Sequence, residues 1–375
     1  MKIWFECTGC VGIEHTFLEW GDAIQRQLGH GDEFLYAVNK QNVANGMRGY
    51  GSSVQPKPAL EYEPAGLAGA LMDAQPDVVH CHGMQQLQAL LNVRYPSGRA
   101  PQIVITMHSF RHGTPWRPAA AAMDGLIFRK HRGLVTPHFL STRSLDEFYR
   151  WLPMLPKLSR CVVFPLGVRE PAPRNGHSGE LDGFLKELAA LEIPRVVYLA
   201  EMHPVKRHAH LVEELAPLLR SGECVLVLCG DGPEAGRVRQ TAERLGVTEQ
   251  VKMPGHIPRD RIWDVLRACN VGVCSSRSEN SPRCVVEPLS AGLPVVTTDV
   301  GSAAMYVRDF VNGFVVPQCA ERGTLGKKVG TLLRDRELRE QMSRAANSSV
   351  LPEYSWQECA RKTACMYRAA IANQT

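Results

Sequence analysis

Residues 275–292, SSRSENSPRCVVEPLSAG, carry the pattern that decides the fold, and LPVVTTDVGS follows them. Glu279 and Glu287 stand eight positions apart, after an apolar strand-like run that ends at Cys274. A helix is expected to start near Arg283, which places Glu279 in the loop at the strand's carboxyl end and Glu287 one turn inside the helix. The amino end of a helix offers free N–H groups and partial positive charge to a diphosphate. A nearby carboxylate can accept hydrogen bonds from sugar hydroxyls, although solvated loop and helix-face charges fit this spacing equally well.

Short apolar runs alternate with helical segments along the whole chain. This order is typical of parallel α/β layers, in which a helix that packs on the sheet follows each strand. Helices are expected over residues 14–28, 84–93, 207–220, 233–245, 259–268, 283–291 and 322–346. The expected strands are residues 2–6, 34–38, 78–81, 102–106, 134–136, 161–164, 195–200, 224–229, 251–253, 271–274, 295–297 and 314–316.

The length of 375 residues suggests two domains, because single domains usually hold about 100–200 residues. Residues 169–183, REPAPRNGHSGELDG, are rich in proline, glycine and polar side chains and suit a linker. We expect a first α/β domain over 1–170, a linker over 171–193, a second α/β domain over 194–353 and a terminal helical segment over 354–375. The carboxyl ends of the strands make the cleft between the domains the expected ligand site.

Charge and composition exclude several classes of protein. There are 43 Lys and Arg against 38 Asp and Glu, a formal charge of only +5, which does not by itself indicate nucleic-acid binding. The start, MKIWFECTGCVGIEH, lacks the apolar core of a signal peptide, and no run approaches the ~18–20 apolar residues of a membrane span. A soluble, cytoplasmic protein is expected. Cys7 and Cys10 could form half of a zinc site or a redox pair, but no second CxxC completes a tetrahedral set.

Several motifs of the second half occur in the order of one known family. Two glutamates eight positions apart, then AGLPVV at 291–296 and a later glycine, resemble the paired-glutamate motif of the retaining glycosyltransferases of the large "group 1" family, which have the GT-B architecture. NGF at 312–314, GDGPE at 230–234 and MPG at 253–255 resemble further motifs of that family. The resemblance implies two Rossmann-like parallel α/β domains that face each other across a cleft. The matching positions of the main motif are Glu279, Glu287, Ala291, Gly292, Pro294, Val295, Val296 and Gly301.

The resemblance also implies roles for individual residues. Glu287 is expected to bind the ribose of a sugar-nucleotide donor, Glu279 to contact the transferred sugar, and Lys206 to bind the donor pyrophosphate. The expected donor-binding residues are Glu287, Lys206, Arg283, Cys284, Gly12, Gly232, His256 and Ile257.

Two positions depart from the family pattern. Glu201 stands where the family usually has an arginine, and we expect Arg283 or Arg207 to supply the missing positive charge. Pro282 replaces a glycine of many members, and it removes one backbone N–H from the diphosphate-binding region.

The first half resembles the family's acceptor-binding domain more faintly. Gly12 belongs to a glycine-containing loop after the first strand, where backbone can approach a phosphate or sugar, or where the strand simply ends in a turn. PDVVHCH at 76–82 and FPLGV at 164–168 resemble further family motifs. His108 ends the motif T-M-H and corresponds to a family histidine that reaches the donor sugar. The expected catalytic residues are His108, Glu279 and Lys206.

Residues 94–132 contain seven Arg and Lys against one acid, Asp124, with Trp116 and other apolar residues interleaved. A solvated surface explains such a stretch, and so does contact with an anionic membrane that carries a lipid-diphosphate acceptor.

Together these features predict a glycosyltransferase of the hexosyl-transferring type (EC 2.4) that moves a sugar with retention from a nucleotide-diphosphate sugar to a hydroxyl acceptor. A UDP-sugar is favoured, with a GDP-sugar as the alternative. The expected acceptor is a glycan or lipid-linked intermediate of bacterial surface polysaccharide or lipopolysaccharide assembly, used in the cytoplasm or at the inner face of the membrane. No cofactor and no nucleic-acid partner is expected. No metal is expected either, because the sequence lacks an Asp-x-Asp motif.

Two other functions stay open, and one is disfavoured. A GT-B epimerase of UDP-sugars would share the cleft, but it needs an additional acid/base set that the sequence does not reveal. A non-catalytic binder of nucleotide sugars is compatible with Glu201. A dehydrogenase is disfavoured because the strand after Gly230, Gly232 and Gly236 ends in PG at 254–255 without the acidic residue that binds a dinucleotide ribose.

Overall fold

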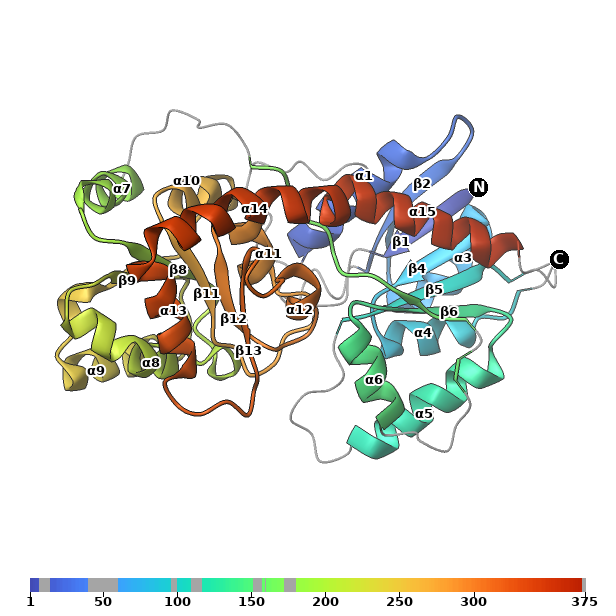
Figure 1. The fold of residues 1–375 in the computed structure, drawn as a ribbon. Helices are drawn as coiled ribbons and strands as arrows, with labels where there is room; N and C mark the ends of the chain where they lie inside the picture. Colours follow the sequence, from blue (N-terminus) through green and yellow to red (C-terminus); the bar gives the residue numbers. More distant parts are fainter. Residues whose placement is uncertain are drawn as a thin grey trace. The chain divides into compact units, whose positions relative to one another are not determined.

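The computed structural model describes residues 1–6, 14–39, 60–95, 100–108, 117–150, 157–158, 160–171 and 180–372. They divide into two compact units. Unit 1 consists of Met1–Gly167 with Trp356–Thr375, and unit 2 consists of Val168–Ser355. Each unit has its own parallel sheet with flanking helices, which confirms the α/β architecture that the sequence predicts (Figure 1).

Unit 1 contains a seven-stranded sheet in the order β3-β2-β1-β4-β5-β6-β7. Strand β3 is absent from the sequence-based prediction because its three residues, LEY, are too few to show an alternating pattern. The strands are β1 Lys2–Glu6, β2 Glu33–Asn39, β3 Leu60–Tyr62, β4 Val78–Cys81, β5 Gln102–Met107, β6 Val135–Phe139 and β7 Val162–Val163. The helices are α1 Glu14–Gln27, α3 Leu67–Ala74, α4 Met84–Leu91, α5 Arg117–Lys130, α6 Thr142–Arg150 and α15 Trp356–Ala372.

Unit 2 contains a six-stranded sheet in the order β10-β9-β8-β11-β12-β13. The strands are β8 Arg195–Leu199, β9 Val225–Cys229, β10 Val251–Gly255, β11 Val271–Cys274, β12 Val295–Thr298 and β13 Gly313–Val316. The helices are α7 Glu180–Ala190, α8 His208–Arg220, α9 Ala235–Leu245, α10 Ile262–Arg267, α11 Arg283–Ser290, α12 Ala303–Tyr306, α13 Thr324–Arg334 and α14 Arg336–Tyr354.

Two helical predictions need correction. The single helix expected over 322–346 is two helices, α13 and α14, because Asp335 leaves the helical conformation and its side chain caps α14 by accepting a hydrogen bond from Leu338 N at 2.9 Å. The expected linker contains helix α7, whose Leu188 is buried in the core of unit 2. The proline- and glycine-rich composition of residues 169–183 hid the apolar spacing of the residues that follow.

The C-terminal helix α15 completes the core of unit 1. It packs against α1, where Trp20 Nε1 donates to Thr363 Oγ1 at 3.0 Å and Trp356 Nε1 donates to Glu19 Oε2 at 2.9 Å. The chain therefore returns to the first sheet after unit 2 has been completed. None of the helices in the described ranges has both the length and the apolar character needed to span a bilayer.

A chain of buried hydrogen bonds runs from α15 across three strands of unit 1. Tyr367 Oη lies 2.6 Å from His80 Nδ1, His80 Nε2 lies 2.7 Å from Thr106 Oγ1, and Thr106 Oγ1 lies 2.9 Å from His138 Nδ1. His138 Nε2 lies 2.9 Å from the carbonyl oxygen of Phe164, which can only accept. The direction of every bond follows: Tyr367 donates to His80, which donates to Thr106, which donates to His138, and both imidazoles are neutral.

The central strands of unit 2 create an edge suited to a ligand. The chain builds β9 and β10 on one side of β8 and places β11, β12 and β13 on the other. In a doubly wound sheet the loops that follow two such neighbouring strands diverge at their carboxyl ends and leave a crevice. The loops after β8 and β11 are those that carry Lys206 and Glu279.

Candidate active site

Lys206 and Glu279 meet at this crevice. Lys206 ends a short 3-10 turn, Pro204–Lys206, after β8, and Glu279 lies in the loop after β11. Lys206 Nζ and Glu279 Oε1 are 2.6 Å apart, with 24% and 12% of the two side chains exposed. Burial alone would lower the pKa of Lys206, but the adjacent Glu279 carboxylate outweighs it and holds the pKa above its usual range. Lys206 is therefore a fixed positive charge at the edge of the sheet.

Glu279 is oriented by a second chain of hydrogen bonds. Ser276 Oγ donates to Glu279 Oε1 at 2.6 Å and lies 2.7 Å from the hydroxyl of Tyr198 in β8. The Ser276 proton goes to the carboxylate, so the single hydroxyl proton of Tyr198 is shared between Ser276 Oγ and the carbonyl oxygen of Lys206, 3.2 Å away. The Tyr198 ring is fully buried and stacks on His208 with the ring centres 4.7 Å apart. This arrangement fixes one oxygen of Glu279 from two sides.

Two hydrogen bonds to backbone carbonyl oxygens also join the loops after β8 and β11. Arg277 N donates to Val205 O at 2.8 Å, and Ser275 Oγ donates to Lys206 O at 3.0 Å. These bonds hold the two chemically functional side chains on a rigid support.

Glu287 lies in α11 and is paired with Arg283, one turn earlier. Arg283 Nε donates to Glu287 Oε1 at 2.9 Å, and its Nη2 lies 2.7 Å from the same oxygen. The Glu287 side chain is buried, and a buried carboxylate is costly unless it has a hydrogen-bonded partner. Arg283 therefore orients Glu287 in this structure.

Cys284 follows Arg283 in the first turn of α11, and its side chain is buried beside Cys274 at the end of β11. A hydrogen bond between the two thiols lowers the pKa of Cys274 to about 7 and raises the pKa of Cys284.

The loop after β9 brings the glycine-rich turn against the loop after β8. Gly232 has φ +152°, and a Cβ atom there would lie 2.6 Å from the carbonyl oxygen of Met202. No other residue type fits without moving this backbone. Asp231, beside it, accepts a hydrogen bond from His256 N at 3.0 Å, so the loop after β10 is attached to the same turn. His256 is exposed, whereas Ile257 is buried.

Further positive charge near Lys206 comes from Arg207 and Arg277. Burial and then the nearby Arg277 lower the pKa of Arg207, against an opposing effect of Glu214. Arg207 also has a left-handed backbone, with φ +59°. Glu201 is exposed. Sequence reasoning missed Arg277, although its place two residues before Glu279 in the loop could have indicated it.

The remaining predicted residues belong to unit 1. His108 follows β5, and its Nε2 lies 3.1 Å from His82 Nδ1. Burial, and then the nearby His138, lower the pKa of His108 to about 3, so its imidazole is neutral at physiological pH. Gly12, Cys7 and Cys10 lie outside the described residues.

The structure thus brings Lys206, Glu279 and Cys284 together in unit 2, with Arg283 and Glu287 paired along the same helix, α11. Gly232, His256 and Ile257 come from the loops after β9 and β10 of the same sheet.

Comparisons with known proteins identify relatives of this chain. Residues 186–349 match the family "Glycosyl transferases group 1". A D-inositol 3-phosphate glycosyltransferase of Streptomyces griseus is 30% identical over 232 residues, which are 58% of this chain and 48% of that protein. A glycogen synthase of Mycobacterium tuberculosis is 26% identical over 311 residues, 79% of this chain and 69% of that protein. The chain spans about half the length of several curated relatives that it matches.

Solved structures with the same fold cover nearly the whole chain. A glycosyltransferase from Rickettsia africae superposes with a TM-score of 0.76 at 15% identity, over 99% of both chains. Anabaena HepE in complex with UDP superposes with a TM-score of 0.76 at 17% identity, over 98% of this chain and 100% of that one. The two parallel sheets are therefore those of the GT-B architecture, as the sequence predicts. Residues 186–349 of this chain therefore match the group 1 glycosyltransferase family.

Proposed function

We propose that the protein is a retaining glycosyltransferase that moves a sugar from a nucleotide-diphosphate sugar to a hydroxyl acceptor. The observation that carries the proposal is the 2.6 Å contact between Lys206 and Glu279 at the carboxyl ends of β8 and β11. This contact places a fixed cation and an oriented carboxylate at the point of a doubly wound sheet where nucleotides bind. Retention is inferred from the family and not from the geometry.

Lys206 is the proposed partner of the leaving diphosphate. Departure of the sugar concentrates negative charge on the diphosphate, and a cation held in place beforehand stabilises that charge without reorganisation. Glu279 keeps Lys206 in position and uses its other oxygen to bind a hydroxyl of the transferred sugar. From unit 1, His108 is the proposed additional contact with the sugar, through a neutral imidazole.

Glu287 is the proposed ligand of the donor ribose. Its buried position suits two hydrogen bonds from vicinal hydroxyls, and Arg283 would keep it oriented. We further propose that the base lies against the backbone at His256 and Ile257. The turn at Gly232 and the first turn of α11 at Cys284 would receive the phosphates.

Arg207 is the better candidate for the charge that Glu201 does not provide. Arg283 is engaged with Glu287, whereas Arg207 is near both Arg277 and Glu214 and forms no ion pair among the described residues. An anionic diphosphate would relieve the repulsion between Arg207 and Arg277. This relief favours binding of the charged donor.

UDP is the first base to test. The same fold occurs in Anabaena HepE in complexes with UDP and with UDP-glucose, and in WaaG, a glycosyltransferase involved in lipopolysaccharide biosynthesis. These likenesses support a UDP-sugar donor over a GDP-sugar, and a glycan or lipid-linked acceptor of surface polysaccharide assembly in the cytoplasm.

Helix α5 and its surroundings support a peripheral contact with an anionic membrane through residues 94–132. Met123 and Leu126 expose 58% and 59% of their surface. Arg129, Arg132, Lys157 and Arg160 line a pocket of about 150 Å³ in the same unit. Apolar side chains beside basic ones suit insertion among anionic lipid head groups. Arg99, Arg111 and Trp116, which also contribute to the predicted patch, lie outside the described residues.

The proposed activity is tested by release of the nucleoside diphosphate from UDP-sugars and GDP-sugars, with and without a bacterial glycolipid extract. Transfer that requires the extract and is lost in Glu279→Gln supports the proposal. Absence of turnover with every donor, despite nucleotide binding, would instead support a non-catalytic binder. For the membrane contact, equal flotation of the protein with anionic and neutral liposomes would reject the proposal.

A further inference from the structure

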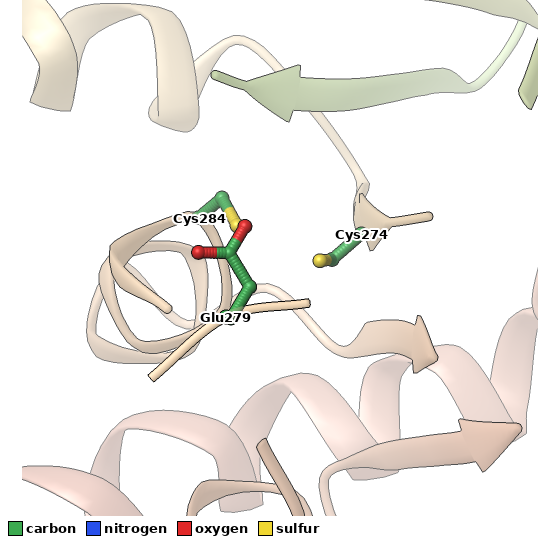
Figure 2. Close-up of side chains that lie close together, drawn as sticks. All are labelled: Cys274, Glu279 and Cys284. Atoms are coloured by element: carbon green, nitrogen blue, oxygen red, sulfur yellow. The ribbon is translucent and has the colours of Figure 1, made fainter. Parts of the chain in front are cut away.

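Three potential metal ligands converge at the crevice of unit 2. They are the sulfur of Cys274 at the end of β11, a carboxylate oxygen of Glu279 in the following loop and the sulfur of Cys284 in the first turn of α11. These ligand atoms all lie within 4.8 Å of one another. Figure 2 shows the Cys284 sulfur beside the Glu279 carboxylate, with the Cys274 sulfur directed into the same space from the strand end. Both cysteines are free thiols.

The spacing of these atoms is close to that of a tetrahedral site. Zinc binds thiolate sulfur at about 2.3 Å and carboxylate oxygen at about 2.0–2.2 Å, which separates its ligand atoms from one another by roughly 3.5–3.8 Å. Small side-chain rotations are therefore enough to bring three atoms that already lie within 4.8 Å onto one ion. A water molecule would be the fourth ligand.

Glu279 can take part without losing its present partners. Among the described residues, the hydrogen bonds of its side chain from Lys206 and Ser276 both reach Oε1. Oε2 is therefore available on the other side of the carboxylate. Cys284 is 5% exposed and Cys274 is fully buried, so an ion would enter from the side of Glu279 and Cys284.

The charges balance when a divalent cation binds. Two thiols release their protons to solvent and become thiolates, and with the Glu279 carboxylate they carry three negative charges. The Lys206 ammonium offsets one of these charges, and a divalent cation neutralises the remaining two. Because two of the three ligands are sulfur, the site favours Zn²⁺ or Co²⁺ over Mg²⁺ or Ca²⁺.

We propose that Cys274, Cys284 and Glu279 form a binding site for a thiophilic divalent cation, with Zn²⁺ as its physiological type. Occupation of the site has a second consequence, which rests on the proposed glycosyltransferase function. An ion on Glu279 takes the oxygen that would bind the transferred sugar, so Zn²⁺ competes with the sugar-nucleotide donor and inhibits transfer.

The test of the site uses the full chain in a reducing, chelator-free buffer, with Co²⁺ as the probe. Tetrahedral thiolate-bound Co²⁺ absorbs in the near ultraviolet and the visible. We expect one equivalent of Co²⁺ to produce these bands and one equivalent of Zn²⁺ to remove them. Cys284→Ser and Cys274→Ser should abolish the bands or weaken Co²⁺ binding about 100-fold.

Other thiols provide the controls. The double variant Cys319→Ser/Cys365→Ser removes the two exposed thiols of the described chain, and Cys7→Ser/Cys10→Ser removes the CxxC of the sequence. Both should keep the bands. Circular dichroism verifies that each variant is folded. If Cys274→Ser does not fold, Cys284→Ser alone is used to test the site. Wild-type protein without bands, or a folded Cys284→Ser variant with unchanged bands, would overturn the site.

The inhibitory consequence has a separate readout. Zn²⁺ should weaken turnover of the sugar donor at least tenfold at saturation, and a chelator should restore it. Unchanged turnover in the presence of bound Zn²⁺ would contradict the proposed competition between Zn²⁺ and the donor. It would not contradict the metal site, which the Co²⁺ spectrum tests. A protein that binds Co²⁺ as expected but has no transferase activity would overturn the proposed function and not the metal site.

Discussion

Lys206 Nζ lies 2.6 Å from Glu279 Oε1 although 73 residues separate the two along the chain. The contact exists because β8 and β11 are neighbours in the sheet, with Val196 paired to Val271 and Val197 to Gly272. Each strand delivers one charged side chain at its carboxyl end. Only 24% and 12% of the two side chains are exposed, so each charge compensates for the other's loss of hydration.

Replacement of Lys206 should affect catalysis more than stability. In Lys206→Met the diphosphate loses its fixed cation, and we expect turnover to fall about 10²- to 10³-fold. Unfolding free energy should fall by about 1–3 kcal/mol, because Glu279 loses its partner in a partly buried position. Steady-state kinetics and urea unfolding measure the two effects. Lys327→Met, at an exposed position of α13, is the matched control and should leave both unchanged.

Arg283→Ala should weaken binding of the nucleotide by about tenfold, because Glu287 loses the guanidinium that orients it. Arg336→Ala is the control, since it removes an exposed arginine that is also paired with a glutamate four residues later, Glu340. Isothermal titration with the nucleoside diphosphate compares the two variants. Equal affinities in both would show that the Arg283–Glu287 pair has only a structural role.

The backbone at Gly232 should tolerate no side chain. Gly232→Ala places a Cβ atom 2.6 Å from Met202 O at a φ of +152°, and we expect a loss of about 2 kcal/mol or more of unfolding free energy. Gly236→Ala is the matched control, because α9 has open space around this helical glycine. It should be neutral or stabilising by up to ~1 kcal/mol. Thermal denaturation distinguishes them, and similar melting temperatures would contradict the account of this turn.

The buried histidines of unit 1 should make the protein sensitive to acid. Burial lowers the pKa of His138 to about 4 and holds the pKa of His80 and His82 well below the usual value. Below pH 6.5 these histidines bind protons in the unfolded chain but not in the folded chain. Their contribution to the free energy of unfolding is therefore fully present above pH 6.5 and is lost as the pH drops toward 4. Each histidine contributes up to ~1.4 kcal/mol per pH unit.

Urea unfolding between pH 7.5 and pH 5, followed by tryptophan fluorescence, measures this dependence. His82→Phe keeps a ring stacked on Phe17, whose centre lies 4.2 Å from that of His82, and it removes one titrating group. Its stability should depend less steeply on pH than that of the wild type. If the unfolding free energy of His82→Phe depended on pH as steeply as that of the wild type, His82 would not contribute to the acid sensitivity.

The sequence predicts the residues of the site better than their contacts. Lys206 and Glu279 follow strands, and their chemistry is visible from the motifs in which they stand. The four-residue spacing of Arg283 and Glu287 on a helix also makes their pairing predictable. The orientation of Glu279 by Tyr198 and Ser276 was not predictable, because it depends on a tyrosine that lies 81 residues earlier in the chain and becomes a neighbour only in the folded sheet.

The fold shows the same division. Strands with continuous apolar runs, such as β9 and β11, are evident from composition, because both faces of a parallel sheet are buried. Strand β3 is too short to give a pattern, and α7 was concealed by the prolines and glycines before it. The proximity of Cys274 and Cys284 depends on how α11 folds back onto β11, which neither residue's local sequence indicates.

Binding of a nucleoside diphosphate to unit 2 is the central claim, and thermal stabilisation tests it most directly. UDP, GDP and ADP are each added at increasing concentration to the wild type and to Glu287→Ala. At 100 times its dissociation constant, the correct nucleotide should stabilise the wild type by about 2.7 kcal/mol. We predict stabilisation by UDP that is lost in Glu287→Ala. Absence of stabilisation by any of the three, or equal stabilisation of the variant by UDP, would contradict the account.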